Sequence, residues 1–308
     1  MAVSYHPPQN PTGRTDPEDG DRARRIFQCV TSDAERAILG FSCEAGVRRN
    51  KGRTGAKDGP AAIRNALFGL AAPSGFSAIT DLGDIQVEGD DLETGQQMLA
   101  DHVSRALRAY KQLIVFGGGH ETAFGSYVGL RTAFPSKKIG IINLDAHLDL
   151  RNIGDAGASS GTPFNQIRNL DPENFDYLCI GAARESNTQA LLDRANDWGT
   201  QIIYDTDLAT SAAAAFSAID AMAERSDIIY LTVDIDLLPH YQAPGVSAPA
   251  VRGVSFAIVE SIIAHVIEAS KAHNALLPLA DFVEVSPPHD KNNMTAKSAA
   301  ILALSLLK

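Results

Sequence analysis

The feature of this chain that most limits its possible folds is a regular alternation of short apolar segments with longer helical patterns. Strand-like segments occur at 37–42, 113–116, 139–144, 177–180, 201–204, 228–233 and 279–285. Helical patterns lie between and after them, at 59–69, 92–110, 121–134, 188–197, 211–225, 255–273 and 292–307. Such alternation predicts right-handed crossovers and a mostly parallel sheet that is covered by helices on both faces.

The length and composition are consistent with one large domain. The chain has 308 residues, of which 44% are hydrophobic, and this is enough to fill a single α/β core. We find no internal repeat and no interdomain linker. Residues 1–25 are polar and rich in Pro, Gly and Asp, so we expect a flexible amino-terminal arm in front of a single domain over residues 26–308.

Charge and cysteine usage exclude several classes of function. The net charge of −10 argues against a nucleic-acid partner, which would need a basic patch. No segment reaches the roughly 18 apolar residues of a membrane helix, and the amino terminus lacks the apolar region of a secretory signal. Cys29, Cys43 and Cys179 are scattered without CxxC spacing, as in reduced intracellular proteins. We therefore expect a cytoplasmic protein with no membrane partner.

Three of the strand-like segments end in residues that could hold a metal. The runs are GGGHE (117–121), NLDAHLDLR (143–151) and TVDIDLLP (232–239). Alternate residues of an extended chain project to one side, so DxHxD and DxD would each aim their ligands at one point. In open α/β sheets, moreover, ligands bind outside the carboxyl ends of strands. The candidate metal ligands are His120, Asp145, His147, Asp149, Asp234 and Asp236.

The chemistry of these six side chains favours a pair of ions. Carboxylate oxygen and imidazole nitrogen without thiolate suit Mn²⁺ better than structural zinc, and six ligands exceed what one tetrahedral ion can use. Two adjacent ions would hold and activate a bridging water. A lone DxD is more often a turn or a helix cap. The DxHxD run is different, because it follows the apolar segment 139–142, and three polar groups there would be costly to desolvate without a partner.

The glycine run before His120 has two other possible functions. A phosphate loop would need GK[ST] or a third spaced glycine, and the sequence GGGHETAFG has neither. His120 could also be an ordinary loop histidine. The interpretation that fits its surroundings best is a tight turn at Gly117, Gly118 and Gly119 that brings His120 to the metals.

Charged residues near the same strand ends are candidates for substrate binding. Asp281 and Glu284 have odd spacing, so one of them should face the cleft, where an acid could bind a cationic group. Arg151 and Arg184 both follow strands, and a guanidinium fork suits a substrate carboxylate. The alternatives are a simple strand-terminal acid and ordinary surface arginines.

Taken together, these runs resemble the ureohydrolase family of arginases, agmatinases and formimidoylglutamases. The family signature is similar to GGxH, DAHxD and DxDxxDP, and this chain has GGGH, DAHLD and DIDLLP, with Pro239 one position early and the preceding acid absent. The segment GRTGAKDGPAAIR (52–64) resembles the family's amino-terminal element, and the resemblance extends from about residue 45 to the end. It implies an arginase-like three-layer α/β/α sandwich in which the six ligands hold two Mn²⁺ ions.

Within the family, the chain most resembles the formimidoylglutamases, on the runs NLDAHLDLR, SSGTPFNQI (159–167), RESNT (184–188) and APGVSAPA (243–250). The resemblance implies hydrolysis of N-formimino-L-glutamate to L-glutamate and formamide, a step of histidine degradation. Asp149 would transfer the proton and Glu284 would hold the formimino group. The expected substrate contacts are Arg151 and Arg184 to the carboxylates, with hydrogen bonds from Thr162 and Asn187.

Two other functions remain open at this point. One is a guanidino-group hydrolase that acts on agmatine, arginine or a guanidino acid; agmatine has no carboxylate to engage Arg151 and Arg184. The other is a non-catalytic metal-binding homologue, whose signature would be a lost ligand, and all six are present. The partner expected in each catalytic case is a small molecule, and the resemblance implies a homo-oligomer, a trimer or a hexamer.

Overall fold

The structure is a computed structural model and describes residues 2–308. Nine strands form one sheet in the spatial order β1-β3-β2-β4-β9-β8-β5-β6-β7. The strands are β1 (Val3–His6), β2 (Arg36–Ser42), β3 (Thr80–Val87), β4 (Gln112–Gly117), β5 (Ile139–Leu144), β6 (Asp176–Ala182), β7 (Gln201–Tyr204), β8 (Ile228–Asp234) and β9 (Leu276–Val283). All neighbouring pairs are parallel except β1 and β3. The predicted mostly parallel sheet is confirmed.

Helices occupy most of the connections between strands. Within the described residues these are α1 (Ala45–Arg49), α2 (Gly59–Gly69), α3 (Leu92–Ala109), α4 (Thr122–Ala133), α5 (Pro163–Leu170), α6 (Gln189–Asp197), α7 (Asp205–Leu208), α8 (Ala213–Arg225), α9 (Phe256–Ala272) and α10 (Met294–Leu307). Short 3-10 helices lie at Pro17–Arg22, Ile26–Cys29, Ala56–Asp58, Pro172–Asn174, Arg184–Ser186, Ile235–Leu237 and Pro287–His289.

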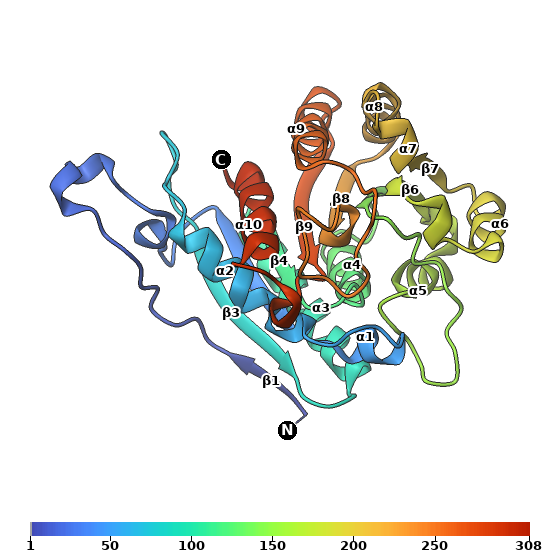
Figure 1. Ribbon diagram of the computed structural model, residues 1–308, viewed down its shortest axis with the longest axis horizontal. Coiled ribbons are helices and arrows are strands. Elements are labelled where there is room, and N and C mark those ends of the chain that lie inside the picture. Colours follow the sequence, from blue (N-terminus) through green and yellow to red (C-terminus); the bar gives the residue numbers. More distant parts are fainter. Residues whose placement is uncertain (1) are drawn as a thin grey trace.

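The helices form a layer on each face of the sheet, which gives three layers in all (Figure 1). Helices α2, α8, α9 and α10 bury their apolar residues in one core, and α3, α4, α5 and α6 bury theirs in the other. Strand β5 contributes to both, because Ile141 packs into one core and Ile142 into the other. A strand that is buried on both faces has a continuous apolar sequence rather than an alternating one. This explains why the segment 139–144 was predicted with its observed ends.

The prediction of a flexible arm over residues 1–25 is wrong for the residues that form β1. Val3–His6 form β1 and pair antiparallel with β3, in the register Val3 to Val87 and His6 to Asp84. The strand closes one edge of the sheet, at the opposite end from β7 (Figure 1). A four-residue edge strand has little sequence signal of its own, and its position depends on a partner about 80 residues away.

The three cysteines are free and buried. Across residues 2–308, none of the helices combines the length and the apolar character that crossing a lipid bilayer would require.

Candidate metal centre and active-site cleft

The candidate metal ligands gather at the carboxyl ends of three strands, β4, β8 and β5, and β9 lies between β4 and β8 in the sheet. His120 follows the end of β4 at Gly117, and Asp234 is the last residue of β8. The run 145–149 begins directly after β5. Because these strands are parallel neighbours, their carboxyl ends share one edge of the sheet, where open α/β sheets bind ligands.

Their ligand atoms form two groups that share one member. His120, Asp145, Asp149 and Asp234 each place a ligand atom within 4.8 Å of the others, and Asp145, His147 and Asp236 do the same. Asp145 belongs to both groups. A carboxylate shared between two ligand sets can hold two adjacent ions at once.

The hydrogen bonding of the first group fits a cation. The Nδ1 atom of His120 faces three carboxylate oxygens, at 3.2 Å from Asp145, 2.9 Å from Asp149 and 3.3 Å from Asp234. This nitrogen is buried and has no hydrogen-bond partner. Oδ1 of Asp236 is also buried without a partner. Buried polar atoms are rarely left unpaired. The residues present therefore fit a binuclear metal site, in which the negative charges of the four aspartates match the positive charges of two divalent ions.

The titration of the imidazoles also reflects the surrounding acids. Burial by itself lowers the pKa of His120, but the carboxylates of Asp145 and its neighbours outweigh burial and hold that pKa well above its usual value. The same balance raises the pKa of His147, which lies 3.2 Å from Asp236. Without a metal, protons take the place of the cations on these nitrogens.

The carboxylates in turn are perturbed by burial and by one another. Burial and then the neighbouring Asp236 raise the pKa of Asp234 well above its usual value. The pKa of Asp236 is raised to about 6, again first by burial. The pKa of Asp149 is raised by burial and by Asp145. Asp145 is the exception, because the two histidines outweigh its burial and lower its pKa. Such crowding of acids is typical of functional sites.

The run 145–149 converges on the metal site for a different reason from the one we predicted. It lies outside β5, so strand pleating does not align its side chains. Instead, Oδ1 of Asp145 accepts a hydrogen bond of 2.7 Å from the backbone N–H of His147, and Asp149 turns into the left-handed region with φ of 47°. Asp234 and Asp236 likewise fall in different ligand groups. The ligands are therefore placed by loop geometry rather than by an extended chain.

His120 is held by contacts on both sides. A Cβ at Gly118 would lie 1.8 Å from the carbonyl oxygen of Cys43, so only glycine permits this turn, as expected of the glycine run. On the far side, Nε2 of His120 lies 3.1 Å from Oγ1 of Thr232. With this contact at Nε2, the other nitrogen, Nδ1, is left to face the metal site.

Glu284, rather than Asp281, faces the cleft. The backbone of Glu284 is left-handed, with φ of 67°, and its Oε1 accepts a 3.0 Å hydrogen bond from the N–H of His120. Its other oxygen, Oε2, is buried without a partner. Asp281 points the other way and accepts a hydrogen bond from the Tyr230 hydroxyl. Burial and Asp234 raise the pKa of Glu284 well above its usual value, and a cationic group bound in the cleft would favour the ionised carboxylate.

A cleft of about 320 Å³ opens above the metal site. It is lined by Asn50, Lys51, Gly52, Arg53, His147, Asp149, Arg151, Ser160, Ser186, Asn187, Leu191, Asp234, Asp236, Ser247, Ala248 and Glu284. The acids lie on its floor with the metal site, and three cations, Lys51, Arg53 and Arg151, line it as well. A ligand that carries a positive group at one end and carboxylates at the other would match this distribution.

The predicted substrate residues have separate locations. Arg151 lines the cleft, but Arg184 does not: it is exposed, and its guanidinium carbon lies 3.5 Å from the centre of the Tyr204 ring. The hydroxyl of Thr162 donates to Ser159 within its own turn, at 2.9 Å. Asn187 touches the cleft, yet its amide supports the ligand loop by accepting from the N–H of Leu148 at 2.9 Å.

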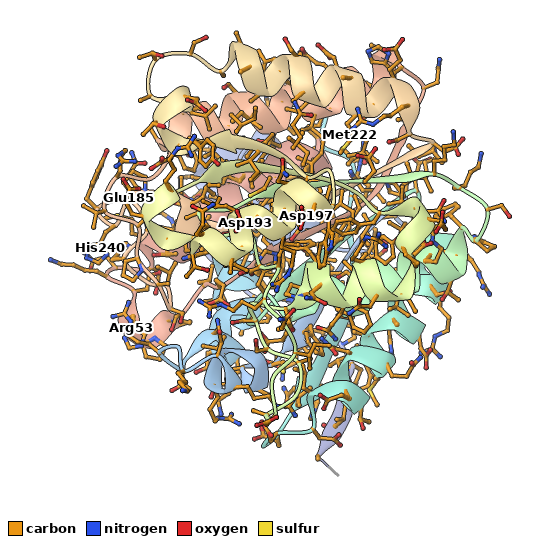
Figure 2. The ribbon with its side chains drawn as sticks, turned by 90° about the vertical axis from the view of Figure 1, so that its right-hand side faces the viewer. Arg53, Glu185, Asp193, Asp197, Met222 and His240 are labelled. Carbon is orange, nitrogen blue, oxygen red and sulfur yellow. The ribbon has the colours of Figure 1, made fainter. Side chains whose placement is uncertain are left out.

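Sequence reasoning missed most of the cleft wall that precedes α2. Asn50, Lys51 and Arg53 come from the end of α1 and the segment after it. Nε and Nη2 of Arg53 donate to the carbonyls of Ser247 and Val246, at 3.1 and 2.6 Å, which ties this segment to the loop after β8. In Figure 2, Arg53 and His240 lie along the same edge of the molecule. The run GRTGAKDGPAAIR (52–64) includes Arg53, but the sequence alone does not indicate that this segment lines the cleft.

Fold and site together define a three-layer α/β/α protein with a candidate binuclear metal site at the carboxyl edge of a mostly parallel sheet. Residues 34–308 match the sequence profile of the Arginase family. The chain belongs to the arginase family.

Individual relatives show which members of the family this chain resembles. The formimidoylglutamase of Citrobacter koseri is 43% identical over 310 residues, which cover 96% of this chain and 96% of that protein. The formimidoylglutamase of Chromobacterium violaceum is 42% identical and covers the same shares. Among solved structures, Bacillus subtilis formimidoylglutamase superposes with a TM-score of 0.82 at 21% identity, and it covers 97% of this chain and 94% of its own. Trypanosoma cruzi formiminoglutamase with Mn²⁺ superposes with a TM-score of 0.80 at 24% identity, and the match covers 92% of this chain and 97% of that one. These two structures confirm the arginase-like fold.

Proposed function

We propose that this protein is a formimidoylglutamase, which hydrolyses N-formimino-L-glutamate to L-glutamate and formamide with two Mn²⁺ ions. The observation that carries the proposal is the distribution of charge in the cleft, with an acidic floor and the cations Lys51, Arg53 and Arg151 on the wall. The substrate has the complementary distribution, because its formimino group is cationic and it carries two carboxylates. Identity of 42–43% to formimidoylglutamases over nearly the whole chain supports the same activity.

The proposed roles follow from where each side chain lies. His120, Asp145, Asp149 and Asp234 would hold one ion, and Asp145, His147 and Asp236 the other. When bound, the two ions lower the pKa of a water molecule enough to provide hydroxide at neutral pH. The unpaired oxygen of Glu284 binds the formimino nitrogen and orients its carbon toward the attacking water. Arg151 binds a substrate carboxylate.

The proton transfer is proposed for Asp149. In the reaction a carbon–oxygen bond forms at the formimino carbon, and the bond from that carbon to the glutamate nitrogen breaks. Asp149 accepts the proton of the attacking water and delivers it to this nitrogen, which leaves as the amine. Asp149 suits this role because it lies both among the ligands and on the lining of the cleft. Arg184, Thr162 and Asn187 have no part in the proposal, because their side chains are engaged elsewhere.

A substrate panel tests the proposal directly. Turnover of N-formimino-L-glutamate, arginine, agmatine and guanidinobutyrate would be measured on protein supplied with Mn²⁺. We expect glutamate release from the first and little urea from the others. Urea release at a higher kcat/KM than glutamate release would instead identify a guanidino-group hydrolase. Metal analysis that finds no bound ion, together with no turnover, would support a non-catalytic homologue.

The cellular setting is proposed on the same basis. We infer that residues 26–308, together with β1 (Val3–His6), form a single catalytic domain, in a cytoplasmic enzyme of histidine degradation that acts as a trimer or hexamer. Light scattering on the purified protein would test the oligomeric state, and a monomer would contradict it.

A further inference from the structure

The backbone conformations of the described chain single out three residues. Six non-glycine residues have positive φ, and the asparagines among them are Asn274, Asn292 and Asn293. Asparagine tolerates this left-handed region because its short amide bonds to the local backbone. The other three are Lys51, Asp149 and Glu284, and all three line the cleft. Asp149 and Glu284 already have proposed roles, which leaves Lys51 as the third strained residue of the cleft.

Lys51 occupies a position where the backbone alone would favour glycine. Its N–H donates to the carbonyl of Arg48 at 3.0 Å, and the N–H of Gly52 donates to the carbonyl of Val47 at 2.9 Å. This pair of hydrogen bonds is the Schellman motif that ends α1, and its left-handed residue is usually glycine. A lysine with φ of 62° at this position is strained, yet the turn fixes where its side chain starts.

The surroundings leave the Lys51 ammonium available for a ligand. Among the side chains that the structure describes, no carboxylate lies at ion-pair distance from the Lys51 ammonium and no hydrogen bond uses it, whereas the neighbouring Arg49 is paired with Glu93 at 2.6 Å. Arg53 is also engaged, with the loop carbonyls. Like Lys51, Arg151 has no ion pair or hydrogen bond from its side chain among the described residues. Lys51 and Arg151 both line the cleft and the outer pocket that adjoins it.

We propose that Lys51 binds one of the two substrate carboxylates beside Arg151, and so helps to determine specificity for an acidic substrate. The inference rests on the proposed function, because it concerns the same cleft. It replaces Arg184, which the cleft does not include, with a cation from a different part of the chain. Two separate cations would then face the two carboxylates of one substrate.

The test compares Lys51→Met with the wild type on three substrates: N-formimino-L-glutamate, its side-chain amide and its α-amide. On the first, kcat/KM should fall by about tenfold to a hundredfold, as for loss of a charge-assisted hydrogen bond, and mainly through KM. On the amide that lacks the carboxylate bound by Lys51, the two proteins should be nearly equal. That amide also identifies which carboxylate is bound. Arg48→Met is the matched control, because Arg48 is exposed on α1, three residues before Lys51, and does not line the cleft.

Lys51→Gly adds a measurement independent of activity. It should lose the same kcat/KM as Lys51→Met while raising the melting temperature by about 1–3 °C, because glycine relieves the left-handed strain. An unchanged kcat/KM for Lys51→Met, or an equal loss on all three substrates, would overturn the role of Lys51 alone. A wild type that is inactive on N-formimino-L-glutamate would overturn the proposed function and this inference together.

Discussion

Gly161→Ala should weaken substrate binding without disrupting the fold. The side chain of Arg151 lies across Gly161, where an added Cβ would meet Cδ of Arg151 at 2.7 Å and Nε at 3.1 Å. The backbone N–H of Arg151 also donates to the carbonyl of Gly161 at 2.9 Å, which keeps the two residues together. Since carbon atoms pack at roughly 3.5–4 Å, the arginine stem must move by about 1 Å. The missing side chain of Gly161 therefore makes room for Arg151.

The size of the effect follows from the contact that is displaced. A hydrogen bond between charged groups contributes about 1.5–3 kcal/mol, and each 1.4 kcal/mol changes the rate tenfold, so kcat/KM should fall by about 10- to 100-fold. The melting temperature should stay within about 3 °C of the wild type, because Gly161 has no positive φ and the displaced group is a flexible side chain. Glutamate release from N-formimino-L-glutamate is the assay.

A double mutant shows whether the loss acts through Arg151. If it does, Gly161→Ala combined with Arg151→Ala should be no worse than Arg151→Ala alone. Gly154→Ala is the matched control, since it lies in the same loop and an added Cβ there meets nothing within 4 Å. Additive losses in the double mutant, or wild-type kinetics for Gly161→Ala, would refute the reasoning.

Three further predictions concern the metal site and its surroundings. Removing metal with a chelator should lower the melting temperature by about 8 °C, since an ion at a thousand times its Kd stabilises the fold by about 4 kcal/mol; an unchanged value would contradict a metal site. Asp236→Asn should leave about one ion per chain by elemental analysis and Asp145→Asn none, because only Asp145 belongs to both ligand groups; equal losses would contradict two separate sites. In metal-free protein, Glu121→Gln should be more stable than the wild type at pH 8 by roughly 2–4 kcal/mol. Burial raises the pKa of Glu121 from 4.5 to about 7, so the wild type loses stability as pH rises through that range; a chemical-denaturation difference that does not vary between pH 5 and 8 would contradict this.

The central strands could be predicted from the sequence because their surroundings are uniform. Segments 139–144 and 201–204 have the predicted ends, and α2 matches 59–69. β3 was missed because Asp81, Gly83 and Asp84 make it look like a loop. In the fold, Arg64 of α2 lies 3.1 Å from Asp81 and 2.9 Å from Asp84, which makes acids acceptable in a strand. That pairing depends on a contact between distant segments, which no local pattern reveals.

In the candidate site, too, some residues could be predicted from the sequence and others could not. Its metal ligands stood out in the sequence because several acids and a histidine followed one apolar segment, although the pleating argument for their alignment was wrong. The substrate wall was less accessible. Arg184 and Arg151 both follow strands, but the ring of Tyr204, on another strand, covers Arg184 and draws it away from the cleft. Lys51 gave no signal of its own, because its significance lies in a backbone angle.

The three strained residues of the cleft indicate where this fold gives up stability for function. A left-handed conformation costs roughly 1–2 kcal/mol for an ordinary residue, so Lys51 and Glu284 together cost about 2–4 kcal/mol, and Asp149 costs less because aspartate can hydrogen-bond to the local backbone. That is a large part of the 5–15 kcal/mol by which folded proteins are typically stable. Lys51 follows the end of α1 and Glu284 follows the end of β9, and hydrogen bonds such as the 2.7 Å contact from the N–H of Glu284 to the carbonyl of Gly118 hold these conformations in place. If only the backbone mattered, glycine would serve better at all three positions. The side chains are therefore best explained by what they bind in the cleft.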